Sequence, residues 1–319
     1  MTRYIVQRAI QALPVLLISS IGIFLIVHLV PGDPALVIAG PDATPEAVAS
    51  VRTNLGLDEP LWNQFFVWLG NVFTGDFGTS YISNLAVSEL IASRLPATVQ
   101  LAVAALLISV VLGFLGGVLA AVFESRPIDW MISSTSAVSI AVPEFWVGIL
   151  LILGGALYLG ILPPGGYVSF AEDPLQAASF ILLPALALSV NTAAVLARFM
   201  RSSMLEVFGE DYIRTAEAKG VRPHLVVTQH VLRNALIPVL TILGIQFGRL
   251  LGGSIVIETV FAWPGIGRLL VDSISNRDYS VVQGVMLLLV VIFVVINLIV
   301  DLLYGAVDPR VRLLTGRST

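Results

Sequence analysis

The chain has 319 residues, of which 57% are hydrophobic and 12% are charged. Soluble domains carry about 25% charged residues, so this composition is typical of an integral membrane protein. The net charge of -4 and the scatter of the basic residues exclude the basic stripe of a nucleic-acid-binding protein, and we expect no nucleic acid partner. The absence of cysteine excludes disulfides, thiolate metal sites and cysteine catalysis.

Six apolar segments are long enough to cross a bilayer, which takes about 20 residues. We therefore predict an all-α integral membrane protein with six transmembrane helices, at 9–30, 97–123, 131–159, 176–197, 235–257 and 281–300. The first segment follows two arginines, as a secretory signal would, but its uncharged run is too long for the core of a signal peptide. We expect it to remain as a membrane anchor.

Lysine and arginine positions predict the orientation, because these residues gather in cytoplasmic loops. With a cytoplasmic N-terminus, most of the 17 basic residues fall on the inner side of the membrane. Both termini are therefore predicted to be cytoplasmic. The basic residues on that side would be Arg3, Arg8, Arg126, Arg198, Arg201, Arg214, Lys219, Arg222, Arg233, Arg310, Arg312 and Arg317.

The segment 31–96 would face outward, and we predict that it forms a helical insertion. Thr44 can cap a helix that begins at Pro45, and Gly56 can end that helix. A second helix is expected after Pro60. Its aromatic face suits either the membrane interface or packing against a neighbouring helix, and comprises Trp62, Phe65, Phe66, Trp68 and Leu69.

The third predicted span contains Glu144 directly after Pro143. A proline in the middle of a span usually marks a kink, so we interpret Pro143 as structural. Several glycines in the second and fifth spans allow close helix contact and could serve either assembly or a hinge: Gly113, Gly116, Gly117, Gly252 and Gly253.

The long cytoplasmic segment 198–234 is predicted to form a helix, a glycine turn and a second helix. The first helix would cover 212–219, Gly220 would end it in a left-handed conformation, and Pro223 would begin the next. Pro238 is expected to mark a bend where the chain re-enters the bilayer. The arginines of this segment could simply fix the topology. However, its small residues would also let another protein approach the backbone, which favours a docking surface.

The fifth span contains Arg249, which is too costly to expose to lipid. It therefore either lines a water-filled translocation path or pairs with an acid such as Glu258 or one on a partner. Gln246 lies three residues earlier and shares the same helix face, which favours a polar lining. Gln246, Arg249 and Glu258 are the candidate path residues.

Catalytic motifs are missing from the sequence. The single lysine, Lys219, is followed by Gly220 and Val221, so the phosphate-binding loop G-x-x-x-x-G-K-[ST] cannot be formed. The three histidines make no H-E-x-x-H pair, and no G-x-S-x-G elbow occurs. We expect a non-catalytic chain with no metal and no bound cofactor, so any ATP would be consumed by another subunit.

Several motifs carry a family resemblance. "YIRTAEAKG" followed by "LRNALIP" resembles the cytoplasmic loop of binding-protein-dependent ABC importer permeases. Arg214 replaces an acid of the wider family pattern and Thr215 replaces an alanine, departures that resemble the dipeptide and oligopeptide subfamily. The N-terminal "RYIVQRAIQALPVLLISSIGIFLIVHLVPGDP", "GDFGTS", "ETVFAWPGIGRLL" and the ending "YGAVDPRVRL" resemble the B-type permease of peptide importers, so the resemblance covers nearly the whole chain.

The resemblance implies an ABC importer permease fold in a bacterial plasma membrane. It implies an N-terminal transmembrane helix at 1–30, an extracytoplasmic helical insertion at 31–96, and a five-helix core at 97–319 that includes a coupling segment at 202–234. That segment would transmit movement from a separate ATPase. The residues expected in the contact are Asp211, Tyr212, Arg214, Thr215, Ala216, Ala218, Lys219 and Gly220.

The same resemblance implies the partners and the mechanism. The partners would be a second homologous permease, two cytoplasmic ATPase domains or subunits that bind ATP and Mg²⁺, an extracytoplasmic substrate-binding protein, a peptide substrate and membrane lipid. The permease would work by alternating access. Relatives of this pattern also carry nickel or glutathione. A secondary transporter driven by an ion gradient is the rival class, but it predicts paired discontinuous spans with embedded acids. A non-transporting scaffold is a third alternative.

Overall fold

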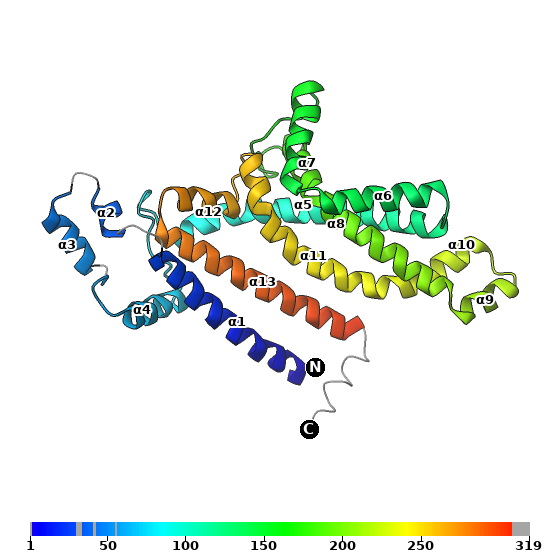
Figure 1. The fold of residues 1–319 in the computed structure, drawn as a ribbon, viewed down its shortest axis with the longest axis horizontal. Helices are drawn as coiled ribbons and strands as arrows, with labels where there is room; N and C mark the ends of the chain where they lie inside the picture. The colour runs from blue at the N-terminus through cyan, green and yellow to red at the C-terminus, as the bar shows by residue number, and fades with distance from the viewer. Residues whose placement is uncertain (1, 30–33, 41–42, 55, 308–319) are drawn as a thin grey trace. The chain divides into compact units, whose positions relative to one another are not determined.

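The computed structural model describes residues 2–29, 34–40, 43–54 and 56–307. Over these ranges the chain is helical, apart from connecting loops and one isolated β-bridge between Thr79 and Ala86 (Figure 1). The chain divides into two compact units, Met1–Thr98 with Pro264–Val295, and Val99–Trp263 with Ile296–Thr319. The C-terminal motif "YGAVDPRVRL", which carries part of the family resemblance, lies largely outside the described residues.

The first unit contains the N-terminal helices and the helices that follow residue 264. They are α1 (Thr2–Leu29), α2 (Pro34–Ala39), α3 (Pro45–Asn54), α4 (Leu61–Phe73), the start of α5 (Val87–Val122), α12 (Ile266–Ser275) and most of α13 (Tyr279–Val307).

The second unit contains the remainder of α5 and the helices up to residue 260. They are α6 (Pro127–Ala141), α7 (Glu144–Leu151), the π-helix η1 (Ile152–Tyr158), α8 (Pro174–Phe208), α9 (Asp211–Ala218), α10 (Pro223–Leu225), the π-helix η2 (Val226–Val231) and α11 (Leu232–Val260).

Four helices of the described chain are long and apolar enough to cross a membrane: Val87–Val122, Pro174–Phe208, Pro223–Val260 and Tyr279–Val300. A broken pair, Pro127–Ala141 with Glu144–Tyr158, brings the number to five. In α1 the apolar stretch Ile10–Ile26 is shorter than these spans. The integral membrane character is therefore confirmed, whereas the count of six spans stays a prediction.

The break in the third predicted span occurs at Pro143. We predicted one kinked helix, but the two halves meet at 105°. Val142 is extended, with φ -85° and ψ 131°, because a residue before proline is disfavoured in the helical region. Proline also lacks the N–H that would continue the helix. The two halves are consequently separate helices, as Figure 1 shows for α6 and α7.

Another proline behaves differently from prediction. The second predicted span was expected to begin at residue 97, but α5 begins ten residues earlier at Val87 and continues through Pro96. The predicted division of the chain at residue 96 thus falls inside a helix. α11 also contains a proline, Pro238, and the bend that we expected there stays a prediction; a π-helical turn at Val226–Val231 precedes this helix.

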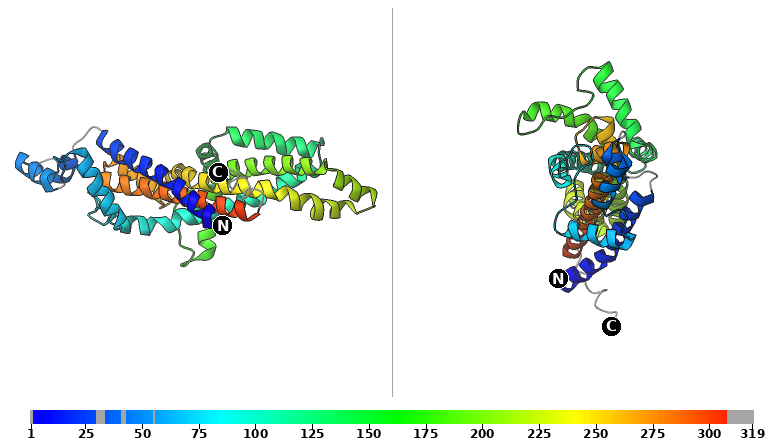
Figure 2. Two further views of the ribbon diagram at one scale, coloured as in Figure 1. Left: turned by 90° about the horizontal axis from the view of Figure 1, so that it is seen from below. Right: turned by 90° about the vertical axis from the view of Figure 1, so that its left-hand side faces the viewer.

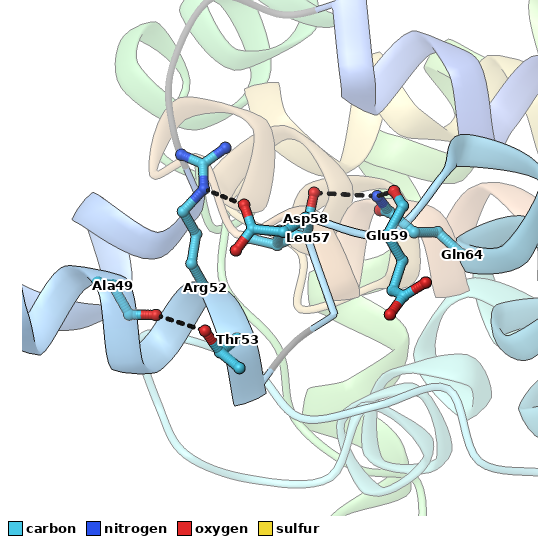
Figure 3. Close-up of polar contacts among 7 residues, drawn as sticks. All are labelled: Ala49, Arg52, Thr53, Leu57, Asp58, Glu59 and Gln64. Atoms are coloured by element: carbon cyan, nitrogen blue, oxygen red, sulfur yellow. Dashed lines mark hydrogen bonds and ion pairs between the residues drawn. The ribbon is translucent and has the colours of Figure 1, made fainter.

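The predicted insertion helices are present. The Thr44 hydroxyl accepts the Ala47 N–H at 3.3 Å, and Gly56 has φ +65°, as expected for the two ends of α3. Figure 3 shows how the following turn is held: Arg52 contacts the Asp58 carboxylate at 2.9 Å, and the Gln64 amide donates to the carbonyls of Leu57 and Glu59. The short helix α2 and the amphipathic helix α12 were not predicted.

For the aromatic face of α4 we left two roles open, packing against a neighbouring helix and contact with the membrane interface. The rings of Phe65 and Trp68 lie 5.4 and 5.9 Å from the ring of Phe24 on α1. By contrast, Trp62 and Phe66 are 70% and 66% exposed. One part of the face therefore packs against a helix, and the other is free to contact lipid or a partner.

The helices α5 and α8 approach closely in the second unit. A Cβ atom added at Gly113 would lie 2.9 Å from the Ala193 carbonyl oxygen, and one added at Gly117 would lie 2.7 Å from the Ala197 carbonyl oxygen. The Ser109 hydroxyl also reaches the Ser189 carbonyl at 3.2 Å. These two glycines therefore serve packing within the chain, since small residues let backbones approach in a membrane.

Residues of two sequence motifs make contacts that join distant parts of the chain. In "GDFGTS", Gly78 has φ +81° and donates its N–H to Asp76, while Ser80 donates to the buried Asp278 just before α13. In "ETVFAWPGIGRLL", the fully buried Trp263 ring packs edge-on against Tyr167 with centroids 4.9 Å apart.

Candidate functional site

Two long helices carry the predicted coupling segment. α8 begins at Pro174, where the Asp173 carboxylate accepts the N–H groups of Leu175 and Gln176 at 3.0 Å each. Its 35 residues rise about 52 Å, more than the hydrocarbon core of about 30 Å. One part of α8 must therefore project beyond the bilayer. In the second unit, α9 and α10 lie at the end of α8 and at the start of η2 and α11 (Figures 1 and 2).

The short helix α9 is anchored by one side chain. Ile213 is 1% exposed and belongs to an apolar cluster with Met200, Met204, Val226 and Val231, which come from α8 and η2. The Tyr212 hydroxyl also accepts a hydrogen bond of 2.9 Å from the Asn234 amide. α9 is therefore part of a compact unit with the helices that carry it.

Gly220 ends α9 in the way that we predicted. It has φ +79°, it donates its N–H to the Glu217 carbonyl at 2.9 Å, and the Val221 N–H reaches back to Ala216 at 3.2 Å. These two bonds form a Schellman motif, in which the residue with positive φ satisfies the last carbonyls of a helix. Pro223 then begins α10, as predicted.

Ile213 points inward, and the predicted contact residues lie around the rest of α9. Ala216 is half-buried, and the other seven are exposed: Asp211, Tyr212, Arg214, Thr215, Ala218, Lys219 and Gly220. A Cβ atom added at Gly220 would meet nothing within 4 Å. We define this outer face of α9 together with Gly220 as the coupling knob. Ile213 was missed by sequence reasoning, although it is the only large apolar residue of α9 other than Tyr212.

An ion pair between a buried carboxylate and a half-buried arginine joins α6 and α8. Asp129 is 3% exposed and contacts Arg201 through two hydrogen bonds of 2.6 and 2.8 Å. The same carboxylate accepts the N–H of Ser125, which has φ +61°, and the hydroxyl of Ser133. All four contacts satisfy one carboxylate, as a buried charge requires. The pair therefore fixes the turn between α5 and α6.

The three candidate path residues on α11 do not form one group. Arg249 is exposed and donates a long hydrogen bond of 3.4 Å to Gln246, whose side chain is buried. Glu258 is 0% exposed. Nine residues separate it from Arg249, which places it about half a turn around the helix and about 13 Å along it. Arg249 therefore has a polar neighbour in Gln246, but Glu258 lies elsewhere.

A different acid, Glu144, approaches the face of α11 that carries Arg249. Glu144, the first residue of α7, interacts electrostatically with Arg249. Its Oε2 atom lies 2.8 Å from the position that a Cβ atom would take on Gly253 of α11. The break at Pro143 brings Glu144 to this place. Sequence reasoning noted Glu144 as an ionisable residue within a span but did not connect it with Arg249.

Comparison with protein families decides the identity. The model of the binding-protein-dependent transport system inner membrane component matches residues 113–313, and the model of its N-terminal region matches residues 1–102. The chain belongs to this family. It is therefore a permease subunit, an inner-membrane multi-pass component of a transport system, as the motifs of the coupling segment predicted.

Individual relatives match the permease over nearly its full length. It is 47% identical to a predicted peptide transport system permease of Brucella abortus (strain 2308), over 98% of this chain and 99% of the relative. It is also 47% identical to the glutathione transport system permease of Escherichia coli (strain K12), with the same coverage of each chain.

Solved structures confirm the predicted fold class. The permease is similar to a chain of the inward-facing MetNI methionine ABC transporter, with a TM-score of 0.58 and 20% identity, over 69% of this chain and 96% of that one. An amino acid ABC transporter structure matches with a TM-score of 0.53 and 18% identity, over 69% and 94% of the two chains. At these identities the likeness concerns the fold alone.

Proposed function

We propose that this permease is the membrane subunit of an ATP-driven importer of short peptides. The 47% identity to both a peptide and a glutathione permease supports a substrate with peptide bonds and free charged ends. Uptake by alternating access would deliver the peptide from an extracytoplasmic binding protein to the cytosol. Nickel transport, our alternative within the family, has no metal-binding group to support it among the described residues.

The partners that we propose follow from the family. A second, homologous permease would complete the membrane pore, and lipid would surround the pair. Two ATPase domains or subunits would bind ATP and Mg²⁺ in the cytosol, so this chain would bind no cofactor itself. Both termini of the permease would be cytoplasmic, and the helices between α1 and α5 would face outward toward the binding protein.

The observation that carries the proposal is the coupling knob. It presents the exposed side chains of α9, while Ile213 packs into the cluster formed with α8 and η2. An exposed face on a firmly packed helix can pass movement to the helices that it contacts, since packed elements transmit displacement. We propose that the ATPase binds this face and moves α8 and α11 with it.

Gly220 offers a direct test of this proposal. A Cβ atom there would meet nothing within 4 Å, so a tryptophan side chain would start in open space and project from the coupling knob toward a bound partner. We expect Gly220→Trp to insert in the membrane and bind substrate-loaded binding protein, but to lose peptide uptake and the stimulation of ATP hydrolysis. Gly220→Asn is the matched control, because asparagine tolerates positive φ and is small. Normal stimulated ATP hydrolysis in Gly220→Trp would contradict the proposal.

The substrate class is tested separately, with the assembled transporter in proteoliposomes. We expect uptake of dipeptides or oligopeptides, and glutathione is the second candidate because of the equal identity to a glutathione permease. Uptake driven by an ion gradient without ATP would support the rival class and contradict the account.

We also propose that Gln246 and Arg249 line the translocation path. Arg249 is exposed within an apolar helix, and contact with lipid at this depth would cost about 2.5 to 3.5 kcal/mol. The place of the fully buried Glu258 in the path stays a prediction.

A further inference from the structure

A cluster of polar groups with unmet hydrogen-bonding capacity lies between α7 and α11. Gln246, Arg249 and Gly253 are spaced three and four residues apart, so they share one face of α11. Glu144 lies against Gly253 at the start of α7. We name Glu144, Gln246 and Arg249 the charged cluster.

The hydrogen bonds of the charged cluster are incomplete. In the described part of the chain the Glu144 carboxylate has no hydrogen-bond partner, and Arg249 donates one long bond, to the side-chain amide oxygen of Gln246. The Gln246 amide nitrogen is buried without any acceptor. An unpaired buried polar group destabilises the fold, and the hydrocarbon core of a bilayer offers no water to replace the missing partner.

A structural ion pair would be arranged differently. Buried pairs that compensate their desolvation close to direct contact and share hydrogen bonds, as Asp129 and Arg201 do at 2.6 and 2.8 Å. Within the described residues Glu144 and Arg249 interact electrostatically but form no ion pair within 4 Å. Both charges therefore remain available to a third group.

We infer that the charged cluster binds the two ends of a zwitterionic peptide as it crosses the membrane. Glu144 accepts hydrogen bonds from the N-terminal ammonium group, and Arg249 donates to the C-terminal carboxylate, while the side-chain oxygen of Gln246 orients Arg249. This inference rests on the proposed transport of peptides and adds that the permease itself recognises their terminal charges.

The spacing of the charged cluster fits a short peptide. Gly253, which Glu144 contacts, is one helical turn from Arg249, or about 6 Å of rise. A dipeptide extends over about 7 Å at most. Glu144 and Arg249 thus meet α11 at positions one turn apart, on the scale of a dipeptide, and their opposite charges complement its two charged ends.

Gly253 provides the space that the Glu144 carboxylate occupies. An added Cβ atom would lie 2.8 Å from Oε2 of Glu144 and 3.3 Å from Leu188. At the neighbouring Gly252 an added Cβ atom would meet nothing within 4 Å. Gly253→Ala therefore displaces the carboxylate while both charges are retained, and Gly252→Ala is its matched control.

The test compares peptides that differ in one terminal charge, in proteoliposomes that contain the complete transporter. We expect Glu144→Gln to lower the uptake of a dipeptide with a free amino group by about tenfold or more relative to its N-acetyl form, the effect of losing a hydrogen bond to a charge. Arg249→Gln should do the same for the free carboxylate relative to the C-terminal amide. The preference for the charged over the blocked peptide is compared between variant and wild type. The selectivity of the binding protein is the same in both, so it cancels.

If a charge variant fails to assemble with the ATPase, the variants Gly253→Ala and Gly252→Ala still test whether the charged cluster recognises the peptide ends. Gly253→Ala should reproduce the loss shown by Glu144→Gln, and Gly252→Ala should transport normally. Equal loss for all peptide forms, or no change in the ratios, would overturn the inference and indicate a structural pair or a contact with the second permease. Failure of the wild type to transport any peptide would instead overturn the proposed function.

Discussion

The close contact between α5 and α8 allows a sharp test of how this permease core is held together. A Cβ atom added at Gly117 would lie 2.5 Å from the Met200 Cβ and 2.7 Å from the Ala197 carbonyl oxygen. One residue earlier, at Gly116, the nearest atoms would be 3.7 Å away, which is an ordinary contact distance. The two positions therefore make a matched pair in the same helix turn.

We expect alanine to change the free energy of unfolding differently at the two positions. Alanine favours a helix over glycine by about 0.5 to 1 kcal/mol, and this gain applies at both positions. At Gly117 the backbones of α5 and α8 must also move apart by about 1 Å to restore ordinary contact. Such overpacking costs about 1 to 3 kcal/mol. We expect Gly117→Ala to lose about 1 to 2 kcal/mol of stability and Gly116→Ala to be neutral or slightly more stable.

The assay is unfolding of the purified permease in mixed micelles, with the two variants measured side by side. The difference between them isolates the contact, because the helix-propensity term is common to both. Equal stability of Gly116→Ala and Gly117→Ala would refute the close packing of α5 on α8.

Three further predictions concern other parts of the chain. Asp129→Ala should lower the free energy of unfolding by about 1.5 to 3 kcal/mol, because it removes the charged hydrogen bonds of the half-buried Arg201, and the double variant Asp129→Ala/Arg201→Met should lose less than the sum of the two single variants; additive losses in this double-mutant cycle would contradict the pairing. Ile213→Ala should detach α9 from its cluster at a cost of about 2 to 5 kcal/mol and speed proteolysis of the coupling knob, while Ile213→Val should cost about 0.5 to 1.5 kcal/mol; identical proteolysis of both variants would contradict the anchoring role. Deletion of residues 44–68 should impair uptake while the ATPase still co-purifies, and unchanged uptake would remove any role of this insertion in transport.

The elements that were predictable have local causes. Gly220 follows a helical stretch and precedes a proline by three residues, and only a residue with positive φ completes the Schellman motif there. Thr44 and Pro45 similarly predict the start of α3 from capping chemistry alone. The apolar spans follow from composition, because the bilayer selects for them.

The elements that were missed depend on tertiary packing. The start of α5 at Val87 was overlooked because the predicted span began at residue 97, where the long apolar run begins, whereas the helix continues through Pro96 and neighbouring groups can satisfy the carbonyl that a proline frees. The proximity of Glu144 to Arg249 arises from the 105° break at Pro143 and from the space at Gly253. The spacing of residues along the sequence predicts neither the angle between two helices nor a gap beside a glycine. From the sequence, Glu258 was therefore the acid that we considered as a partner of Arg249.

The central claim is that a separate ATPase subunit binds the coupling knob. The chain has no cysteine, so a single Ala218→Cys variant carries a photo-crosslinking label at one defined and exposed place on α9. Ala171→Cys, in the exposed loop before the opposite end of α8, is the matched control. We predict that illumination of the assembled transporter links the label at position 218, and not at 171, to the ATPase subunit in a nucleotide-dependent yield. A label at position 218 that reacts only with water or lipid, while the ATPase remains bound, would contradict the account.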